Sequence, residues 1–581
     1  MKKRWVIHTP ADDTTISELA HKINCSPVIA NLLLQRGIDT QEKVQAFFHP
    51  SLNMLHDPFL MKDMDKAVER LDKAIAHEEK MLIYGDYDVD GTTAVALLYK
   101  YLSPRSNRTC LEYYIPDRYT EGYGVSVKGI DYAADNGFSL MIVTDCGVKA
   151  VDKVAYAKSR GIDIIICDHH TPGDSLPEAV AVLDPQRSDC DYPYKWLSGC
   201  GVSFKLVQAH TLRHHLPMSE LYKLLDLVCV SIASDIVPVT GENRILAYYG
   251  LQQLNEKPSL GLKTIIKTSG ISKQITINDI VFRIGPRINA AGRVESGNKA
   301  VALLTADEKN AAKEIASDIN IFNDRRKKLD HDITEEAVEY VRSTATEQGK
   351  KTTVLYNPNW HKGVIGIVAS RLTESFYRPT IILTESNGLA TGSARSVDGF
   401  DLYFAISQCS EYLENYGGHK YAAGLTLKIE NIEPFKRKFE QIVQETITEE
   451  MLIPQIHIDA QIKLSDITPE LYRMLHKFAP FGPNNMLPVF MTEKVSNFLG
   501  TRRVGRDNEH LKLVVVDDTR ACNDRSGIGF GMGPLYNDVT THKCFDICYS
   551  IQENDFMGRV EIQMILKDIR FPEKQPEPAA N

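Results

Sequence analysis

Short apolar runs that end in acidic or imidazole side chains are the most constraining feature of this sequence. Each run is rich in Ile, Val, Leu or Met, and segments with helical spacing separate the runs. This alternation is typical of a doubly wound α/β fold, in which the carboxyl ends of parallel strands share one edge of the sheet. The runs, each with the residues that follow it, are Met81–Tyr84 with Asp86, Asp88 and Asp90, Leu140–Thr144 with Asp145, and Ile162–Cys167 with Asp168, His169 and His170.

The residues at these strand ends predict a metal centre. Carboxylates mixed with imidazole suit Mn²⁺ or Mg²⁺, and the pattern does not indicate a thiolate site. A further acid, Asp235, follows the helix-like segment LYKLLDLVCVSIAS. Two cations about 4 Å apart would stabilise the attacking and leaving oxygens of a phosphoryl displacement. We therefore expect a two-metal centre at this edge of the sheet.

The same residues have two other interpretations. A single Asp after a strand is more often a helix cap or a loop residue than a ligand. The pattern D-x-D-x-D-G also occurs in calcium loops, but those need a helix on each side and a later Glu at a fixed offset. Here a strand precedes the first Asp, and three successive strand ends carry such residues, so the metal interpretation is favoured.

The chain is long enough for several domains. Its 581 residues and 65.3 kDa exceed what one hydrophobic core supports. Dense charge with i,i+4 apolar spacing predicts a long bridging helix, and short alternating strands near the end predict an antiparallel OB-like β-barrel. The expected divisions are an N-terminal helical segment 1–65, a catalytic α/β domain 66–300, the bridging helix 301–348, a second smaller α/β domain 349–450, the barrel 451–571 and a Pro- and Glu-rich disordered tail 572–581.

Composition excludes a few classes of protein. The net charge of −9 argues against a histone-like coat but says little about local basic patches. No run of about 18 uncharged apolar residues is present, and the N-terminus lacks the apolar core of a signal peptide. The 11 cysteines form no C-x-x-C pair, which is typical of reduced thiols. We therefore expect a cytoplasmic protein that does not cross a membrane.

The motifs around these residues carry a family resemblance. YGDYDVDGTTA, IPDRYTEGYG, VTDCG, CDHH and ASDIVP closely resemble the motifs of the DHH phosphoesterase superfamily. Within it, the sequence is most similar to the RecJ family of single-strand-specific exonucleases. The resemblance continues through GPRINAAGRV, HKGVIGIVASRL, GSARS, GGHKYAAG and PFGPNNMLPVF, so it covers about residues 60–570.

The resemblance implies roles for the residues of the predicted centre. Asp88 and Asp90 would each bind one metal, Asp145 would bridge the two, and His169 and Asp235 would complete the coordination. Asp86 and Asp168 both match motif positions as helpers or orienting residues, and Asp86 is also counted among the metal ligands. His170 would ligate a metal or touch the scissile phosphate. Some relatives have His at the position of Tyr84, which would leave one metal here with one nitrogen ligand fewer.

A second set of residues is suited to binding phosphate. Arginine matches phosphate oxygens with two parallel hydrogen bonds, and a neighbouring glycine lets the backbone approach an anion closely. By resemblance, such residues hold the 5′ end of a strand; the alternative for any one arginine is a salt bridge. The candidates are Arg118, Arg287, Arg293, Ser393, Arg395 and His419. Arg502, Arg503, Arg506, Phe498 and His510 in the barrel, and Asn323, Arg325 and Arg326 on the long helix, are weaker candidates with solvated surface positions as the alternative.

The function that the resemblance implies is metal-dependent hydrolysis of single-stranded DNA from its 5′ end to mononucleotides, in recombination and repair. Expected partners are a helicase and a single-strand-binding protein, and the chain is expected to be a monomer. One alternative is a DHH phosphodiesterase acting on short RNA or cyclic dinucleotides. Another is an inactive single-strand-binding module like the RecJ-related subunit of the eukaryotic replicative helicase, but here every motif acid is present.

Overall fold

A computed structural model describes residues 3–344, 349–517, 524–556 and 559–572 of the chain. These residues form two compact units. One contains Ser51–Leu452, and the other combines Met1–Pro50 with Ile453–Asn581. Apart from its first residue, the predicted disordered tail lies outside the described residues.

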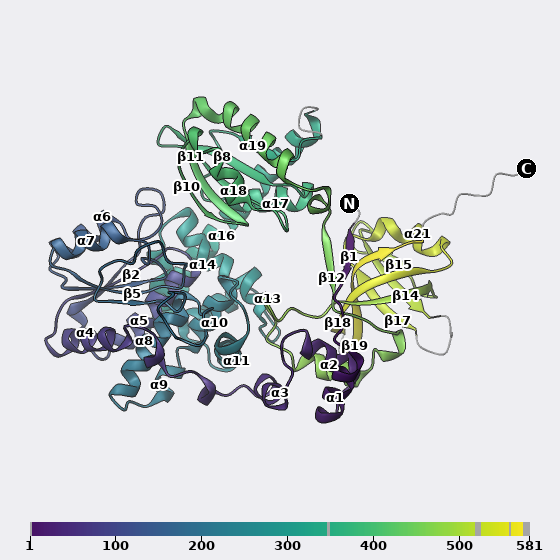
Figure 1. Ribbon diagram of the computed structural model, residues 1–581, viewed down its shortest axis with the longest axis horizontal. Coiled ribbons are helices and arrows are strands. Elements are labelled where there is room, and N and C mark those ends of the chain that lie inside the picture. Colours follow the sequence, from purple (N-terminus) through teal and green to yellow (C-terminus); the bar gives the residue numbers. More distant parts are fainter. Residues whose placement is uncertain (1–2, 345–348, 518–523, 557–558, 573–581) are drawn as a thin grey trace, which may run out of the picture. The chain divides into compact units, whose positions relative to one another are not determined.

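The first half of the larger unit is built on a parallel five-stranded sheet (Figure 1). The strand order is β3-β2-β4-β5-β6, and every neighbouring pair runs parallel. Because the order reverses beside β2, this is a doubly wound sheet, as predicted, with its switch point between β2 and β4. The strands are β2 (Met81–Gly85), β3 (Leu111–Tyr114), β4 (Leu140–Thr144), β5 (Asp163–Cys167) and β6 (Ala181–Leu183).

Alternating side chains bury both faces of this sheet. Met81 and Ile83 of β2 contact the core beneath α4, α5 and α8, whereas Leu82 and Tyr84 face the core beneath α6 and α7 (Figure 1). Strands covered on both faces read as continuous apolar runs, which explains the pattern in the sequence. The helices of this part are α4 (Met64–Ala76), α5 (Val89–Leu102), α6 (Val127–Asp135), α7 (Val151–Ser159), α8 (Gly199–Arg213), α9 (Met218–Tyr222), α10 (Leu225–Ser234), α11 (Gly241–Glu256), α12 (Leu260–Thr268), α13 (Ile277–Asp279), α14 (Gly285–Val294) and α15 (Asn298–Leu304).

A 35-residue helix, α16 (Lys309–Ser343), leads from this part to a second sheet. That sheet has the order β10-β11-β9-β8-β7, and β7 and β8 are its parallel pair. Its elements are β7 (Thr353–Tyr356), α17 (Ile365–Phe376), β8 (Thr380–Ser386), β9 (Leu389–Arg395), α18 (Leu402–Ser407), β10 (Leu413–His419), β11 (Ala422–Leu427) and α19 (Ile432–Thr446).

The smaller unit contains the predicted barrel. Its strands follow the order β13-β14-β18-β19-β17-β16-β15, and an additional β14–β16 pairing closes the ring. Two pairs, β13–β14 and β17–β19, run parallel, so the barrel is not wholly antiparallel. The pair β17–β19 joins non-consecutive strands, and the connection between β13 and β14 is long enough to contain a helix. The strands are β12 (Gln455–Ile458), β13 (Ala460–Gln461), β14 (Phe490–Asn497), β15 (Arg502–Val504), β16 (His510–Val516), β17 (Arg525–Gly529), β18 (Phe545–Phe556) and β19 (Arg559–Arg570), with helices α20 (Pro469–His476) and α21 (Tyr536–Thr541).

The N-terminal residues belong to this smaller unit. The strand β1 (Arg4–Ile7) pairs in parallel with β12, about 450 residues away in the sequence. The helices α1 (Asp13–Ile23), α2 (Pro27–Leu34) and α3 (Gln41–Phe48) share a hydrophobic core with the barrel. The sequence predicts an N-terminal helical segment over 1–65, and in the structure the part of it up to Pro50 belongs to this smaller unit.

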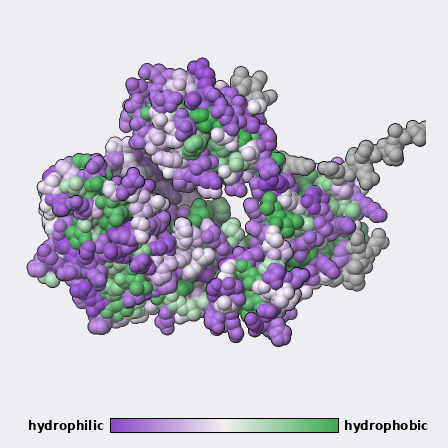
Figure 2. All heavy atoms as spheres, viewed as in Figure 1, coloured by the Kyte–Doolittle hydropathy of each residue, from purple (hydrophilic) through white to green (hydrophobic). Residues whose placement is uncertain are grey.

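Hydrophilic residues cover most of the face shown in Figure 2, with small hydrophobic patches between them. Within the described residues, no helix is long and apolar enough to cross a membrane.

Candidate metal centre

The predicted ligands meet where β2, β4 and β5 end. Asp88 is the N-cap of α5, and its side chain accepts a hydrogen bond from the Gly91 amide at 3.0 Å. Asp145 follows β4 with a left-handed φ of 60°, which turns the chain sharply at the end of the strand. Because the three strands are parallel neighbours, their carboxyl ends bring these side chains to one edge of the sheet, as predicted.

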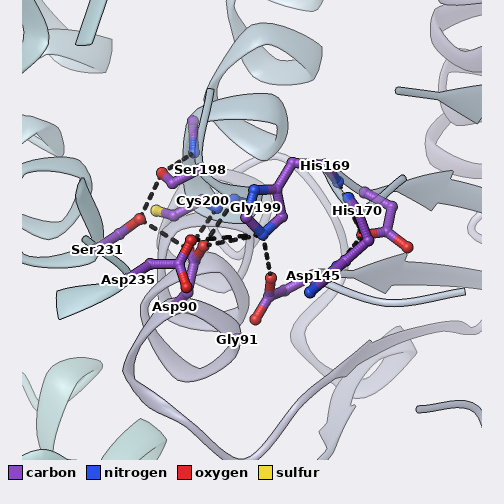
Figure 3. A network of polar contacts seen from close by, with 12 residues as sticks. Asp90, Gly91, Asp145, His169, His170, Ser198, Gly199, Cys200, Ser231 and Asp235 are labelled. Carbon is purple, nitrogen blue, oxygen red and sulfur yellow. Dashed lines mark hydrogen bonds and ion pairs between the residues drawn. The ribbon is translucent and has the colours of Figure 1, made fainter. Parts of the chain in front are cut away.

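The carboxylate of Asp90 is held by the start of another helix. The backbone amides of Gly199 and Cys200, at the N-terminus of α8, donate to it at 2.7 and 2.8 Å. The Ser231 hydroxyl donates to the same carboxylate at 2.7 Å (Figure 3). Free backbone amides and the helix dipole both stabilise negative charge at a helix N-terminus. Asp90 is therefore fixed in position while it is buried.

The imidazole of His169 points into a ring of carboxylates (Figure 3). Its Nε2 atom lies 3.2 Å from Asp145 Oδ1, 3.6 Å from Asp235 Oδ2 and 3.7 Å from Asp90 Oδ2. This buried nitrogen has no hydrogen-bond partner in the described part of the chain. A cation bound among these four atoms would satisfy all of them.

Asp168 orients the two histidines and does not face the carboxylates itself. Its Oδ1 atom accepts hydrogen bonds from the backbone amide of His169 at 2.7 Å and from His170 Nδ1 at 2.7 Å. Its Oδ2 atom accepts from the Val148 amide at 2.9 Å. These contacts lower the pKa of Asp168 despite the opposing effect of burial. This is the orienting position that the sequence predicts for Asp168.

The remaining acids of the centre are buried close to one another. Burial raises the pKa of Asp86 well above its usual value, and the neighbouring Asp88 raises it further. Burial and nearby carboxylates likewise raise the pKa values of Asp88, Asp145 and Asp235. The Oδ1 atom of Asp86 is also buried without a hydrogen-bond partner among the described residues. Hard oxygen donors with unbalanced charge and one orphaned imidazole nitrogen fit divalent cations such as Mn²⁺ or Mg²⁺.

The geometry groups these side chains into two adjoining sets of possible ligands. In each set, the ligand atoms lie within 4.8 Å of one another. One set contains Asp86, Asp88 and Asp145, and the other contains Asp90, His169 and Asp235. Asp145 also groups with His169, so it lies between the two sets. Asp88 and Asp90 fall in different sets, in line with the expectation that each binds one metal. The sequence assigns His169 and Asp235 to neither metal in particular, and the role of each residue stays a prediction.

Tyr84 takes no part in the centre. Its hydroxyl donates to the Gly124 carbonyl at 2.8 Å and accepts from the Ser126 amide at 3.1 Å. Its ring stacks on Tyr114 in the core on the far face of the sheet. Burial raises the pKa of this phenol, so it stays neutral. The tyrosine therefore anchors the loop before α6 and offers no oxygen ligand in place of the missing nitrogen.

Arginines gather beside the acids. Burial, together with the neighbouring Arg118, Arg326 and Arg395, lowers the pKa of Arg293 to about 9, whereas Asp88 opposes this shift. The guanidinium of Arg118 lies over the Tyr87 ring, 4.7 Å from its centroid. Within the described residues, Arg118, Arg293 and Arg395 form no ion pair, so the salt-bridge alternative does not apply to them. Guanidinium groups brought together without counter-anions are suited to binding phosphate.

The second sheet supplies the other phosphate-binding candidates. Arg395 donates to Ser393 Oγ at 3.1 Å. Arg395 and His419 both pair with Ala422 in the register of β11, one from each side, so the three side chains share a face. Burial and Arg395 lower the pKa of His419. The close approach of α17 depends on Gly366, where an added Cβ would lie 3.0 Å from Ser393 Oγ.

The remaining predicted residues make other contacts or belong to the other unit. Arg287 is engaged locally, since it donates to the Arg283 carbonyl at 2.6 Å and to Asn320 Oδ1 at 3.3 Å. Asn323 on α16 is fully buried, and both polar atoms of its amide lack a partner in the described part of the chain. The barrel candidates Arg502, Arg503, Arg506, Phe498 and His510 belong to the other unit.

Several contributing residues were not predicted from the sequence. Ser198 caps α8 and shares a hydrogen bond with Ser231, which completes the cradle around Asp90 (Figure 3). A serine followed by Gly-Cys-Gly is the available signal, because it marks a helix start with accessible amides. Tyr123 donates to the Asp145 carbonyl at 3.2 Å. Lys362 lies near Arg118, which lowers its pKa after the larger effect of burial.

Comparisons with known proteins agree with this architecture. Residues 80–232 match the model of the DHH family N-terminal domain, residues 349–445 match the DHHA1 domain, and residues 458–568 match the RecJ OB domain. A Bacillus subtilis protein described as single-stranded-DNA-specific exonuclease RecJ is 37% identical over 99% of this chain and 72% of its own length. The Salmonella typhimurium protein of the same description is 31% identical over 94% of this chain and 96% of its own.

Solved structures share the fold. A RecJ structure from Thermus thermophilus in complex with Mn²⁺ superposes with a TM-score of 0.83 at 24% identity, covering 98% of this chain and 80% of that one. A structure of exonuclease RecJ bound to manganese has a TM-score of 0.59 at 29% identity, over 69% of this chain and 98% of that one. With its three domains, its acid and histidine cluster and its full-length relatives, the chain belongs to the RecJ family of single-stranded-DNA-specific exonucleases.

Proposed function

We propose that this chain is a two-metal exonuclease that hydrolyses single-stranded DNA from its 5′ end and releases mononucleotides. The observation that carries the proposal is the pair of ligand sets joined at Asp145, with unpaired arginines next to them. Acids alone would suit many metal sites, and arginines alone would suit many anions. Together they fit a substrate that brings phosphate groups to divalent cations.

In this proposal the metal ligands hold the two cations and are already in position before the cations bind. Asp86 and Asp88 would hold one cation, Asp90, His169 and Asp235 would hold the other, and Asp145 would serve both. When bound, the two cations lower the pKa of a water molecule and neutralise charge on the transferring phosphoryl group. The protein keeps the ligands in place beforehand, since Asp90 is fixed by α8 and His169 by Asp168.

The basic residues position the strand. Arg293 interacts electrostatically with both Asp88 and the neighbouring arginines, so it is suited to bind the scissile phosphate or the next one. His170 is anchored through Nδ1 by Asp168, and its Nε2 atom remains near Tyr123 at the entrance to the centre. On the second sheet, Arg395, Ser393 and His419 would grip the terminal 5′ phosphate and so set the direction of digestion. The barrel would bind the strand farther along.

A substrate panel tests the proposal. The protein would be incubated with a single DNA strand, the matching duplex, a short RNA and a cyclic dinucleotide, each with Mn²⁺, Mg²⁺ or EDTA. We expect metal-dependent release of mononucleotides from the single strand, with Asp145→Asn as the inactive control. Cleavage of only the short RNA or the cyclic dinucleotide would assign the centre to a small-substrate phosphodiesterase. Binding without hydrolysis would favour an inactive single-strand-binding module.

The cellular setting is part of the same proposal. Its chemistry requires a source of free 5′ single strands, which a helicase supplies, and a single-strand-binding protein would keep those strands open. Action as a monomer in the cytoplasm during recombination and repair follows from the resemblance to RecJ. Stimulation of digestion of a duplex by an added helicase tests the partner, and light scattering in solution tests the oligomeric state.

A further inference from the structure

A second cluster of metal-ligating side chains lies outside the centre described above. Asp72 on α4 meets His210 and His214, which are spaced i and i+4 at the end of α8. The ligand atoms of the three residues lie within 4.8 Å of one another. We propose that Asp72, His210 and His214 form a binding site for a transition-metal ion of the Zn²⁺ class. Nothing in the exonuclease proposal uses these residues.

The separations suit tetrahedral coordination. Asp72 Oδ1 lies 2.8 Å from His214 Nε2 and 3.4 Å from His210 Nε2. For metal–ligand bonds of about 2.0–2.1 Å, neighbouring ligands of a tetrahedron are about 3.3 Å apart. Two histidines one helical turn apart are a common way for a helix to supply a pair of such ligands. The site lies at the C-terminal end of α8, where the helix dipole favours a cation.

A chain of hydrogen bonds fixes which nitrogen of His210 faces Asp72. The Thr211 hydroxyl is 2.7 Å from the Val207 carbonyl, and it must donate to that carbonyl because a carbonyl can only accept. Thr211 therefore accepts from the Tyr101 hydroxyl, which lies 2.7 Å away. The Tyr101 oxygen in turn accepts from His210 Nδ1 at 2.9 Å. In the neutral ring the proton is on Nδ1, so Nε2 carries the lone pair.

This assignment leaves two acceptors facing each other. The lone pair of His210 Nε2 and the carboxylate oxygen Oδ1 of Asp72 are 3.4 Å apart, an unfavourable contact between two acceptors that a bound cation would relieve. The hydrogen bond from Nδ1 to Tyr101 is also the contact that metal-binding histidines ordinarily make through their second nitrogen. His210 is buried, whereas His214 and Asp72 are partly exposed, so an ion could enter from solvent with water as its fourth ligand.

The competing arrangement is an ion-pair cluster without a metal. Arg213 Nε lies 3.2 Å from Asp72 Oδ2, and a hydrogen bond from either histidine would satisfy the other oxygen, Oδ1. The metal site and the ion-pair cluster differ in whether a metal ion or a proton lies between Asp72 Oδ1 and the imidazoles. Arg213 occupies Oδ2 and leaves Oδ1 directed at both imidazoles, so the geometry allows the metal and the arginine to use different oxygens of one carboxylate.

Co²⁺ is a suitable probe because tetrahedral Co²⁺ with nitrogen ligands absorbs visible light strongly. The full-length protein would carry Asp145→Asn and His169→Ala, which remove the bridging acid and the buried imidazole of the other centre. We expect this parent to bind one Co²⁺ with tetrahedral visible bands, and excess Zn²⁺ to displace it. Zn²⁺ should also raise the Tm of this parent, since the ion would join α4 to α8.

Three variants of that parent decide the question. His214→Ala, at a partly exposed position, should abolish the bands, while His77→Ala on α4, which removes an exposed histidine outside the cluster, should keep them. Tyr101→Phe should weaken Co²⁺ binding about tenfold by removing the acceptor for Nδ1. Absence of the bands in the folded parent, or equal bands in parent and His214→Ala, would overturn the proposal. Circular dichroism of each variant would establish that it is folded.

Discussion

The Nε2 atom of His169 lies 3.2 Å from the Oδ1 atom of Asp145, and this buried nitrogen has no hydrogen-bond partner among the described residues. The two atoms come from the ends of adjacent parallel strands, so the topology of the sheet brings them together. A separation of this size suits two ligands of one cation. The contact also joins the two ligand sets, which makes Asp145 the residue on which both depend.

Replacing Asp145 should therefore remove activity without unfolding the protein. Asn has nearly the same shape and tolerates the left-handed φ of 60° at this position, whereas the charge that bridges two cations is lost. We expect Asp145→Asn to lower kcat at least about 1000-fold, which corresponds to several kcal/mol of lost metal stabilisation. Near-normal turnover by a folded variant would contradict the assignment of the centre.

Ser231 should affect metal binding through Asp90. Its hydroxyl donates to Asp90 Oδ1 at 2.7 Å and contacts no other predicted ligand. We expect Ser231→Ala to raise the Mn²⁺ concentration needed for half-maximal activity about tenfold, with kcat at saturating Mn²⁺ largely preserved. A variant with the parental Mn²⁺ dependence would show that the amides of Gly199 and Cys200 suffice to fix the carboxylate.

Asp86 should show a conflict between stability and function. Burial and Asp88 raise its pKa, so in EDTA at neutral pH the buried charge destabilises the folded state. Asp86→Asn should then raise the Tm in EDTA by about 2–4 °C, equivalent to about 1 kcal/mol for a domain of this size. In Mn²⁺ the same variant should be less active than the parent.

The rise in Tm that we expect for Asp86→Asn in EDTA should depend on pH in one direction. An acid whose pKa is raised by folding costs stability above the raised value, and the cost disappears as the pH falls and the native state takes up the proton. The Tm advantage of Asp86→Asn in EDTA should therefore shrink as the pH is lowered toward the ordinary carboxyl range. An advantage that grows on acidification would contradict a raised pKa for Asp86.

Arg395 should discriminate between 5′ ends. It lies beside Ser393 and on one face with His419, without an ion pair in the described part of the chain. We expect Arg395→Ala to lower kcat/KM for a 5′-phosphorylated strand about tenfold or more, and for a 5′-hydroxyl strand much less. Arg437→Ala, which removes an exposed arginine from α19 of the same domain, is the matched control. Equal losses on both strands would count against a 5′-phosphate role.

Removal of the barrel has to follow the division seen in the structure. Deleting only the C-terminal residues would leave β1 without β12 and would expose the apolar faces of α1 to α3. A fragment of residues 51–452 avoids this, because it is the whole of the larger unit. We expect the fragment to have a raised KM for long strands and a nearly unchanged KM for very short ones. Equal changes on both would indicate a structural role for the barrel.

The sequence predicts the catalytic sheet well because its strands are buried on both faces. Apolar runs such as Met81–Tyr84 and Leu140–Thr144 predict strands from the sequence alone. Because parallel strands end at the same edge of a sheet, the acids that follow them must lie close together there. The doubly wound fold and the C-terminal barrel are confirmed by the strand order and by the matching domain families.

Contacts between distant segments could not be predicted in the same way. The strand Arg4–Ile7 has only four residues, and its partner lies about 450 residues later, so no periodicity indicates the pairing. The cradle of Asp90 likewise depends on the start of α8 more than 100 residues away. The resemblance leads one to expect a metal-site position for Tyr84, but its ring packs in the hydrophobic core with Leu82 and Val143, which only the packing reveals.

A time course with a single DNA strand labelled at its 5′ end or its 3′ end tests most directly whether digestion starts at the 5′ end and needs a divalent metal. With Mn²⁺ or Mg²⁺, we expect the 5′ label to be released at once as a mononucleotide and the 3′ label to stay on shortening strands until late. EDTA should stop the release of both labels. Immediate release of the 3′ label, or digestion that continues in EDTA, would contradict this expectation.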